Sequence, residues 1–170
     1  TAYVASGFSA QSFYFGAFFP RKEGERKRLL SQLKSLDAVL IFYESPLRLV
    51  SALCALKELV PYRRVAVCRE LTKIHEEVVR GTIDEVLRVF VDREKQEGIK
   101  GEIVLVIEAP NEQELRADKT SALLSAEERV SDLLNSGQYS KKDIVRILKD
   151  EFGLTRNDAY ELVHHKGQIP

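Results

Sequence analysis

Two groups of polar residues, each at the end of an apolar run, are the parts of the sequence best suited to chemistry. Tyr43-Glu44-Ser45 ends the run Ala38–Tyr43, and Arg69–Lys73 follows the run Arg64–Cys68. Their hydroxyl, carboxylate and amine groups are suited to binding a polar ligand. In open α/β sheets, ligand sites lie in crevices at the carboxyl ends of strands. We therefore expect a ligand-binding or enzyme site at these two strand ends.

Several common cofactor and catalytic motifs do not occur in the sequence. It contains no G-x-G-x-x-G, no Walker loop and no G-x-S-x-G elbow. His75, His164 and His165 do not form a metal-binding spacing with the cysteines, so no metal is expected. Cys54 and Cys68 lie in apolar contexts, which favours a reduced, cytosolic protein.

Alternation of strand and helix signals predicts an α/β fold for most of the chain. Buried strands are expected at Ala38–Tyr43, Arg64–Cys68 and Glu102–Glu108. Helices are expected from the basic segment to about Leu36, from Ser45-Pro46 to before Pro61, and from the Thr82–Glu85 capping box to about Glu94. The segment Val65–Arg80 is too short to include a helix, so we expect a hairpin there and a mixed sheet flanked by helices.

The first 20 residues carry no charge and hold seven of the 14 aromatic residues. A free, solvated N-terminus is not expected to be so apolar. This segment is therefore either a core strand or an interface with upstream sequence, since large apolar patches mark interaction surfaces. The chain has no methionine and begins at Thr1, and we expect it to be part of a longer protein.

The composition changes after Pro110, and no strand-like run follows. Capping signals predict three short helices, at Ser125…Glu128, Ser140…Asp143 and Thr155…Asp158. The last two resemble a helix-turn-helix, which serves either as a packing unit or as a nucleic-acid reader. The expected organisation is an α/β subdomain over 1–110, a linker or irregular helix over 111–122 and a small all-α, helix-turn-helix-like domain over 123–170.

The overall composition indicates a soluble globular protein. Apolar residues make up 44% of the chain and charged residues 31%, and no apolar run is long enough to span a membrane. Lys plus Arg number 26 and Asp plus Glu number 26. This balance gives no support for nucleic-acid binding through bulk charge, although a local basic patch remains compatible with it.

Four motifs occur in order along the chain: Phe15–Lys22, Leu40–Leu49, Arg69–Glu76 and Lys100–Val106. Together they closely resemble the ribosomal small-subunit methyltransferase I family, over about residues 2–109. That family belongs to the tetrapyrrole-methylase superfamily of S-adenosylmethionine (SAM) methyltransferases. It methylates the ribose 2′-hydroxyl of a decoding-centre cytidine in 16S ribosomal RNA. The resemblance implies SAM as cofactor, ribosomal RNA as partner and a homodimer.

The resemblance also implies that the chain holds only part of the SAM site. The family has two α/β subdomains with SAM in the cleft between them, and this chain matches the second subdomain and the helical tail. The N-terminal subdomain, with its Gly-rich loop, is absent from the chain. We therefore expect the chain alone to bind SAM weakly or not at all and to be inactive, with part of its aromatic start facing the absent half.

The resemblance assigns the following residues to the walls of the SAM site: Phe42, Tyr43, Leu71, Thr72, Lys73, Glu102 and Ile103. Core packing is an equal alternative for Phe42 and Ile103. The hydroxyl proton would be polarised or accepted by Glu70, Lys73 or Glu76, and the sequence does not choose among them. Burial would lower the pKa of Lys73 and make it a base, whereas a Lys73–Glu76 ion pair would make these residues structural.

Residues 21–28 form a basic segment with five positive and two negative charges. The RNA-contacting residues expected from it and from its surroundings are Arg21, Lys22, Arg26, Lys27, Arg28, Arg48 and Lys100. The alternative is that these cations only face solvent at the start of a helix. Cations at a helix N-terminus oppose the helix macrodipole, however, and an RNA partner would compensate their charge. Two other functions stay open: methylation of a tetrapyrrole or other small molecule, and a non-catalytic nucleic-acid-binding module built around the tail.

Overall fold

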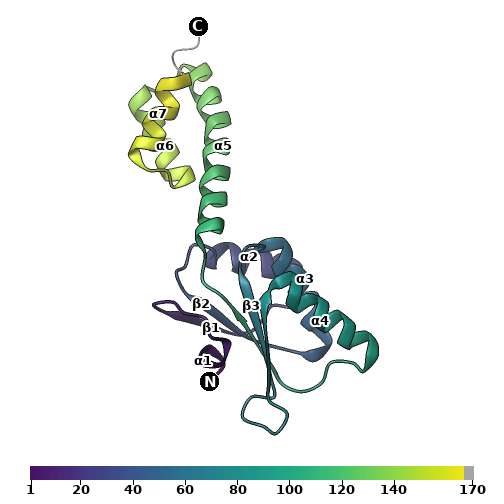
Figure 1. Ribbon diagram of the computed structural model, residues 1–170. Helices are drawn as coiled ribbons and strands as arrows, with labels where there is room; N and C mark the ends of the chain where they lie inside the picture. The colour runs from purple at the N-terminus through teal and green to yellow at the C-terminus, as the bar shows by residue number, and fades with distance from the viewer. Residues whose placement is uncertain (167–170) are drawn as a thin grey trace. The chain divides into compact units, whose positions relative to one another are not determined.

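A computed structural model describes residues 1–166, which fold into two compact units. The first unit, Thr1–Glu114, contains all five strands of the described residues, and the second, from Leu115, is helical (Figure 1). The last four residues of the helical domain expected over 123–170 lie outside the described residues. In the part of the chain that is described, no helix combines the length and the apolar character needed to cross a bilayer.

A five-stranded sheet forms the centre of the first unit, in the order β1-β2-β5-β3-β4. The strands are β1 (Phe13–Phe18), β2 (Val39–Glu44), β3 (Arg64–Arg69), β4 (Glu77–Thr82) and β5 (Ile103–Ile107). β1 runs parallel to β2, whereas β5 is antiparallel to both of its neighbours and β3 is antiparallel to β4. The mixed sheet and the β3–β4 hairpin predicted from the sequence are therefore confirmed.

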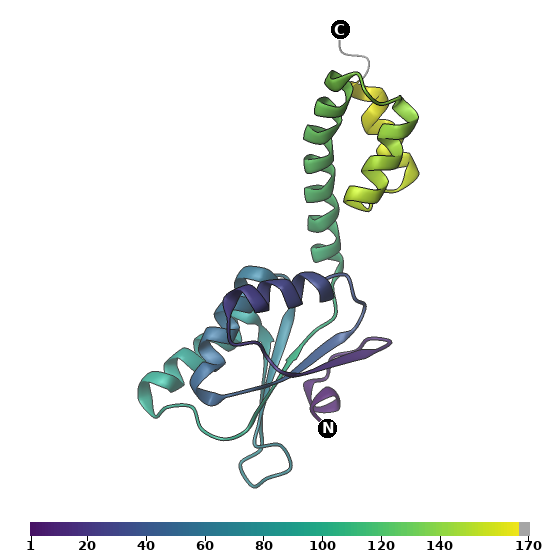
Figure 2. The ribbon, with the colours of Figure 1, turned by 180° about the vertical axis from the view of Figure 1, so that it is seen from behind.

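The central strands are buried on both faces, which explains their continuous apolar sequences. Along β2, Leu40 and Phe42 belong to one core cluster, while Val39 and Ile41 belong to another on the opposite face. The covering helices are α1 (Ala2–Ser6), α2 (Glu23–Leu33), α3 (Leu49–Leu59), which follows a short 3-10 turn at Pro46–Arg48, and α4 (Ile83–Gln96). Figure 2 shows α1 on the side of the sheet opposite to α2, α3 and α4.

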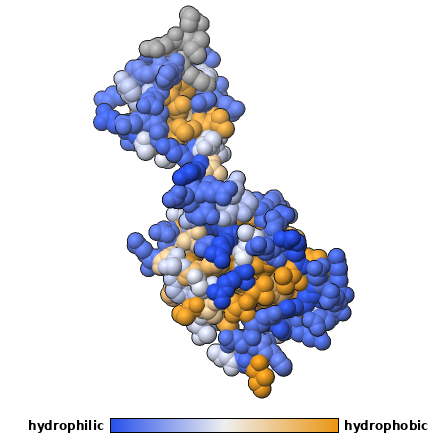
Figure 3. Space-filling view, viewed as in Figure 1, coloured by the Kyte–Doolittle hydropathy of each residue, from blue (hydrophilic) through white to orange (hydrophobic). Residues whose placement is uncertain are grey.

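The aromatic N-terminal segment is divided between core and surface. Phe8 and Phe19 are buried, whereas Phe13, Phe15 and Phe18 are exposed on β1. β1 is an edge strand, so only one of its sides pairs with the sheet. Figure 3 shows apolar surface interrupting the hydrophilic face of this unit. The core-strand interpretation thus holds for only part of the segment.

The helix α5 (Glu112–Ser136) occupies the stretch where the sequence predicts a linker or irregular helix over 111–122 and a new helix at Ser125. It is continuous because its 25 residues include neither Gly nor Pro and are rich in strong helix formers. Ser125 therefore lies inside a helix and caps nothing. In the first turn of α5, Glu114 forms a buried ion pair with Arg63 at 2.7 Å, which attaches the start of the helix to the first unit.

The second unit packs α5 against α6 (Lys141–Phe152) and α7 (Arg156–Lys166). Its core consists of Ala126, Val130, Leu133, Ile144, Leu148, Leu154, Ala159 and Val163. The predicted capping box of Ser140 and Asp143 is present at the start of α6, and Gly153 ends this helix in the left-handed conformation. At the start of α7, Asp158 N–H donates to Thr155 Oγ1, as the third capping signal predicts.

Candidate functional site

A pocket of about 490 Å³ lies at one edge of the sheet in the first unit. β1, β2 and β3 all end at this edge, and the antiparallel β5 begins there, with Ile103 opposite both Glu44 and Arg69. The lining residues are Phe18, Tyr43, Glu44, Ser45, Pro46, Leu71, Gly101, Glu102, Ile103 and Val104. The strand ends singled out in the sequence therefore converge on one pocket.

The pocket brings together four of the residues expected to hold SAM: Tyr43, Leu71, Glu102 and Ile103. Phe42 is fully buried in the core instead, because side chains alternate along β2 and that of Phe42 belongs to the helix-covered face. Thr72 and Lys73 lie in the loop after Leu71 and do not line the pocket.

Glu44 and Arg48 form a buried ion pair beside the pocket. Glu44 Oε1 accepts hydrogen bonds from the Ser45 backbone N–H and from Arg48 Nη2, each at 2.6 Å. Glu44 Oε2 and Arg48 Nη1 are buried without a hydrogen-bond partner among the described residues. Burial raises the pKa of Glu44, while the Ser45 N–H and the Arg48 charge act in the opposite direction. A buried polar atom left without a partner calls for an explanation, and a ligand is one.

Sequence reasoning noted Glu44 at a strand end but did not select it as a site residue. Arg48 was expected to contact RNA, yet it pairs with Glu44 and its side chain is only 22% exposed. The sequence pattern that could have identified this pair is a carboxylate at the end of an apolar run, followed by Ser-Pro and by an arginine four residues after the carboxylate. Such spacing places the arginine one turn beyond the acid, within reach of it.

The expected proton acceptors Glu70 and Lys73 form a cluster at the rim of the site, in which the side chain of Lys73 is exposed and that of Glu70 is half-buried. Glu70 Oε1 accepts hydrogen bonds from Lys73 Nζ at 3.1 Å and from the Glu102 backbone N–H at 2.7 Å. Lys73 Nζ also pairs with Glu102 Oε2 at 3.1 Å. The Glu102 N–H, followed by Lys73, lowers the pKa of Glu70, and hydrogen bonds to Glu102 and Glu70 raise the pKa of Lys73.

The expectation of a desolvated Lys73 with a lowered pKa is therefore wrong. Its side chain is 45% exposed, and both neighbouring carboxylates stabilise its charged form. The alternative Lys73–Glu76 ion pair is also replaced, since Lys73 pairs with Glu70 and Glu102. Glu76 Oε2 instead accepts a hydrogen bond from the Thr72 backbone N–H at 2.6 Å, which closes the loop.

The loop after β3 has a strained backbone. Glu70 and Thr72 have φ values of 51° and 66°, a region that a β-branched residue such as threonine rarely adopts. Gly101, with a φ of 96°, packs so closely that a Cβ there would lie 2.7 Å from Glu70 Cγ. Strained conformations of this kind cluster at functional sites, where surrounding contacts maintain them.

Among the expected RNA-contacting residues, Arg26 is wrongly assigned. It is buried, its Nε donates to the Pro20 carbonyl at 2.7 Å, and its Nη1 donates to the carbonyl and hydroxyl of Ser51. Its guanidinium also lies over the ring of Phe19. Arg26 thus joins the start of α2 to α3, and its charge is directed inward.

Apart from Arg48, the other cations of this group are exposed. Lys27 pairs with Glu23 at 2.7 Å and with Glu58 at 3.5 Å, and Lys22 is 3.6 Å from Glu25. Arg21, Arg28 and the amine of Lys100 make no ion pair with any described residue. Arg21 also lines a second hollow together with Phe18, Ser45 and Arg48, beside the first pocket, which shares Phe18 and Ser45.

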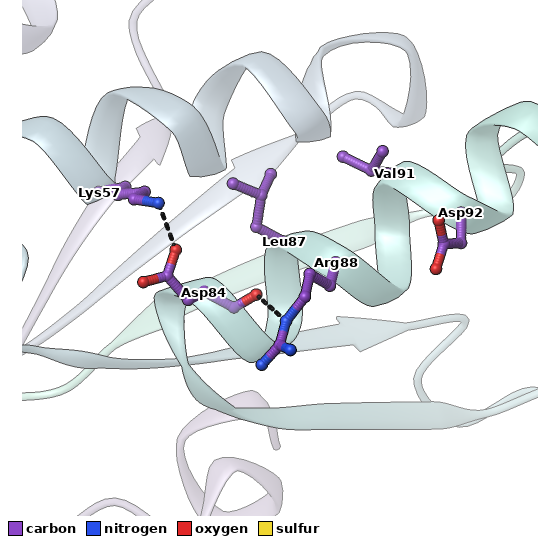
Figure 4. Close-up of a pocket in the computed structure, with 6 residues that line it drawn as sticks. All are labelled: Lys57, Asp84, Leu87, Arg88, Val91 and Asp92. Atoms are coloured by element: carbon purple, nitrogen blue, oxygen red, sulfur yellow. Dashed lines mark hydrogen bonds and ion pairs between the residues drawn. The ribbon is translucent and has the colours of Figure 1, made fainter.

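A third hollow lies between α3 and α4 (Figure 4) and makes a poor candidate site. Its clearest polar contacts are an exposed Lys57–Asp84 ion pair at 2.6 Å and a hydrogen bond from Arg88 Nε to the Asp84 carbonyl. None of the buried, unpartnered side-chain atoms of residues 1–166 belongs to this hollow. Among residues 1–166, no cluster of three or more His, Cys, Asp or Glu side chains is arranged to hold a metal ion.

Comparisons with known proteins give several relatives with known names. The chain is 36% identical to the ribosomal RNA small subunit methyltransferase I of Bacillus subtilis (strain 168), over 98% of this chain and 56% of that protein. Identity to the protein of the same name from Mycobacterium bovis is 44%, over 63% of this chain and 36% of that protein. A crystal structure of the methyltransferase CobJ matches with a TM-score of 0.45 and 16% identity, over 64% of this chain and 51% of that chain.

The chain thus spans only about half the length of the curated relatives that it matches. The sequence model of the Tetrapyrrole (Corrin/Porphyrin) Methylases matches residues 2–87, which include β1 to β4 and the first part of α4. This match covers half of the chain. The chain belongs to the tetrapyrrole (corrin/porphyrin) methylase family.

Proposed function

We propose that this chain supplies one wall of the SAM site of a methyltransferase that acts on the ribose 2′-hydroxyl of a cytidine in 16S ribosomal RNA. The observation that carries the proposal is the pocket in which Tyr43, Leu71 and Ile103 meet the buried Glu44. The relatives are named ribosomal RNA small subunit methyltransferase I, and this name supports the substrate class. A ribosomal RNA substrate also implies a cytoplasmic protein.

The lining of the pocket fits SAM. Its volume of about 490 Å³ lies in the usual range for small-molecule sites, and its apolar side chains suit the adenine ring. Glu44 and Glu102 give the pocket two carboxylates, which favour a ligand that carries a positive sulfonium. When bound, SAM supplies a methyl group already activated for transfer to oxygen.

We assign to Glu44 the acceptance of the substrate's hydroxyl proton. As the methyl group forms its bond to the ribose oxygen, the oxygen must lose its proton, and general-base assistance contributes about 10²-fold or more. Glu44 Oε2 has no hydrogen-bond partner among the described residues, and burial raises the pKa of this carboxyl, which makes it a stronger base than an ordinary glutamate. Lys73, held in its charged form, is not suited to the task.

Residues outside this chain would complete the cleft. The exposed aromatic side chains of β1 (Phe13, Phe15 and Phe18) and the longer relatives support a second α/β half that packs near this edge. We therefore expect the chain alone to bind SAM weakly and to lack activity. The homodimer implied by the family resemblance stays a prediction.

Nuclear magnetic resonance with millimolar SAM tests the cofactor part of the proposal even if binding is weak. We expect the backbone amide signals of Tyr43, Leu71, Gly101 and Ile103 to shift, and those of the α3–α4 hollow, such as that of Leu87, to stay in place. Tyr43→Ala should reduce the shifts at the other pocket residues. Tyr62→Ala is the matched control, because Tyr62 is 40% exposed compared with 44% for Tyr43 and does not line the pocket.

Absence of shifts at the pocket, or equal effects of the two tyrosine variants, would contradict the SAM assignment.

The RNA part has a separate test, in which a decoding-region RNA stem-loop is titrated with the chain. Arg21→Ala/Lys22→Ala should weaken RNA binding without changing the SAM-induced shifts. Its control is Arg88→Ala/Lys95→Ala, which removes the same two residue types from the surface of α4. Binding of a porphyrin with no effect of Arg21 and Lys22 on RNA would favour a small-molecule substrate.

A further inference from the structure

A groove on the second unit carries a set of groups that the methylation site does not use. It lies on α6 and α7 and has a volume of about 800 Å³. Its lining residues are Lys141, Lys142, Asp143, Val145, Arg146, Lys149, Arg156, Tyr160 and His164. Five of its nine lining residues are lysines or arginines, and two more are aromatic.

The charges of α6 and α7 are separated between the groove and the rest of the surface. Residues 141–165 hold five Lys or Arg and five Asp or Glu. All five cations line the groove, whereas Asp143 is the only one of the five acids that does. A segment with no net charge therefore presents a positive surface on one side.

The acids of this segment are also largely engaged elsewhere. Asp143 caps α6 through Ser140, Glu151 pairs with Arg129 at 3.2 Å, and Asp158 pairs with Lys119 at 3.2 Å. By contrast, Lys141, Lys142, Lys149 and Arg156 form no ion pair with any described residue, and Arg146 is 3.9 Å from Asp143. The cations of the groove are thus available to an anionic partner.

An aromatic pair lies among these cations. The rings of Tyr160 and His164 are stacked, with centroids 4.0 Å apart and planes at 29°. Tyr160 is 54% exposed, although an aromatic side chain gains by burial. Successive bases of single-stranded nucleic acid stack on such side chains, and their phosphates follow a positively charged groove.

We propose that the α6–α7 groove binds a single-stranded RNA segment, with phosphates on the lysines and arginines and a base stacked on Tyr160. An acidic peptide would satisfy the cations but would leave the aromatic pair without a planar partner, which is why RNA is favoured. The groove would act as a second RNA contact, separate from the methylation site. The choice of RNA over DNA rests on the proposed function, but the test below requires neither SAM nor methyl transfer.

The test measures the binding of a fluorescent 12-nucleotide single-stranded RNA to the full chain by anisotropy at several salt concentrations. Arg146→Ala/Lys149→Ala removes two phosphate contacts, so the slope of log K against log salt should fall by about 1.4. At about 0.1 M salt this corresponds to binding about 25-fold weaker. Arg88→Ala/Lys95→Ala on α4 is the matched control and should change neither quantity.

A second pair of variants separates stacking from charge. Tyr160→Ala should weaken binding at least roughly fivefold, the lower range for loss of one base stack, and leave the salt slope unchanged. Tyr160→Phe keeps the ring and should bind like the parent chain. Circular dichroism confirms that each variant is folded before it is compared.

Three results would overturn the proposal. These are equal losses for the α6 double variant and the α4 control, no effect of Tyr160→Ala, and equally strong competition by a poly-glutamate peptide of the same length. If the groove variants do not change RNA binding, the SAM-induced shift of the Tyr43 signal is still expected. If SAM shifts no signal of the pocket, the expected RNA anisotropy results do not change. The two proposals therefore fail separately.

Discussion

The end of β2 and the loop after β3 present carboxylates to the same edge of the sheet, but in opposite environments. The side chain of Glu44 is fully buried, and one of its oxygens has no hydrogen-bond partner among the described residues, whereas the side chain of Glu70 is 19% exposed and accepts hydrogen bonds from the Glu102 N–H and Lys73. Burial raises the pKa of Glu44, and hydrogen bonding lowers that of Glu70. The protonation chemistry of a strand-end acid thus depends on its solvation and its donors, and residue type alone does not determine it.

The largest effect is expected from Glu44→Ala. This change leaves the Arg48 guanidinium, only 22% exposed, without its carboxylate. Removing one partner of a buried ion pair strands the other charge, and we expect the free energy of unfolding to fall by about 3 kcal/mol. Urea unfolding followed by circular dichroism measures this loss.

Glu44→Gln is the matched control for that change. It keeps an oxygen that accepts the Ser45 N–H and removes the desolvation cost of the carboxylate. We therefore expect a much smaller loss than for Glu44→Ala. Equal losses for the two variants would contradict this expectation, and would show that the negative charge of Glu44, which both variants remove, provides the stabilisation and not the oxygen that accepts the Ser45 N–H.

The fold follows closely from the sequence where local signals and tertiary packing agree. The apolar runs of β2, β3 and β5, and the Thr82–Glu85 capping box of α4, correspond to the structure because buried strands and capped helices have strong local signatures. The prediction of a new helix at Ser125 was wrong because strong helix formers continue on both sides of this residue and outweigh a single capping residue.

The candidate site was predictable in its location but less so in its chemistry. The strand ends identified Tyr43 and Leu71, since strand direction brings their positions together, whereas Ile103 was implied only by the family resemblance. The burial of Arg26 was not predictable, because five neighbouring cations look alike until one of them folds onto Pro20 and Ser51. The raised pKa of Lys73 likewise depends on Glu102, which is 29 residues away in the sequence.

A second, smaller effect is expected in the acid unfolding of the β3–β4 hairpin. Glu77 at the start of β4 accepts hydrogen bonds from Arg93 and Arg69, which lower its pKa to about 2 from an ordinary 4.5. Because the folded pKa lies below the unfolded one, the stabilisation is present above about pH 4.5 and is lost as the pH falls towards 2. After allowance for solvent screening it amounts to about 2 kcal/mol.

Glu77→Gln should therefore lower stability at pH 7 and flatten its decline between pH 5 and pH 2, as measured by urea unfolding at each pH. The contribution of Glu44 to stability changes with pH in the opposite direction. Its raised pKa gives a contribution that is present below about pH 4.5 and lost as the pH rises through the folded value. If the free energy of unfolding of Glu77→Gln falls between pH 5 and pH 2 as steeply as that of the parent chain, the Arg69–Glu77–Arg93 contacts do not persist in solution.

The smallest effect on stability is expected from Lys73→Ala. Lys73 is exposed at the rim, so we expect the unfolding midpoint to stay unchanged within experimental error. The pKa of Glu70, followed by carbon-13 NMR of its carboxyl group, should rise part of the way to its ordinary value. It should remain lowered because the Glu102 N–H is the larger cause of the shift. Lys95→Ala should leave this pKa unchanged, and a complete return to the ordinary value in Lys73→Ala would mean that the charge of Lys73, and not the backbone of Glu102, controls Glu70.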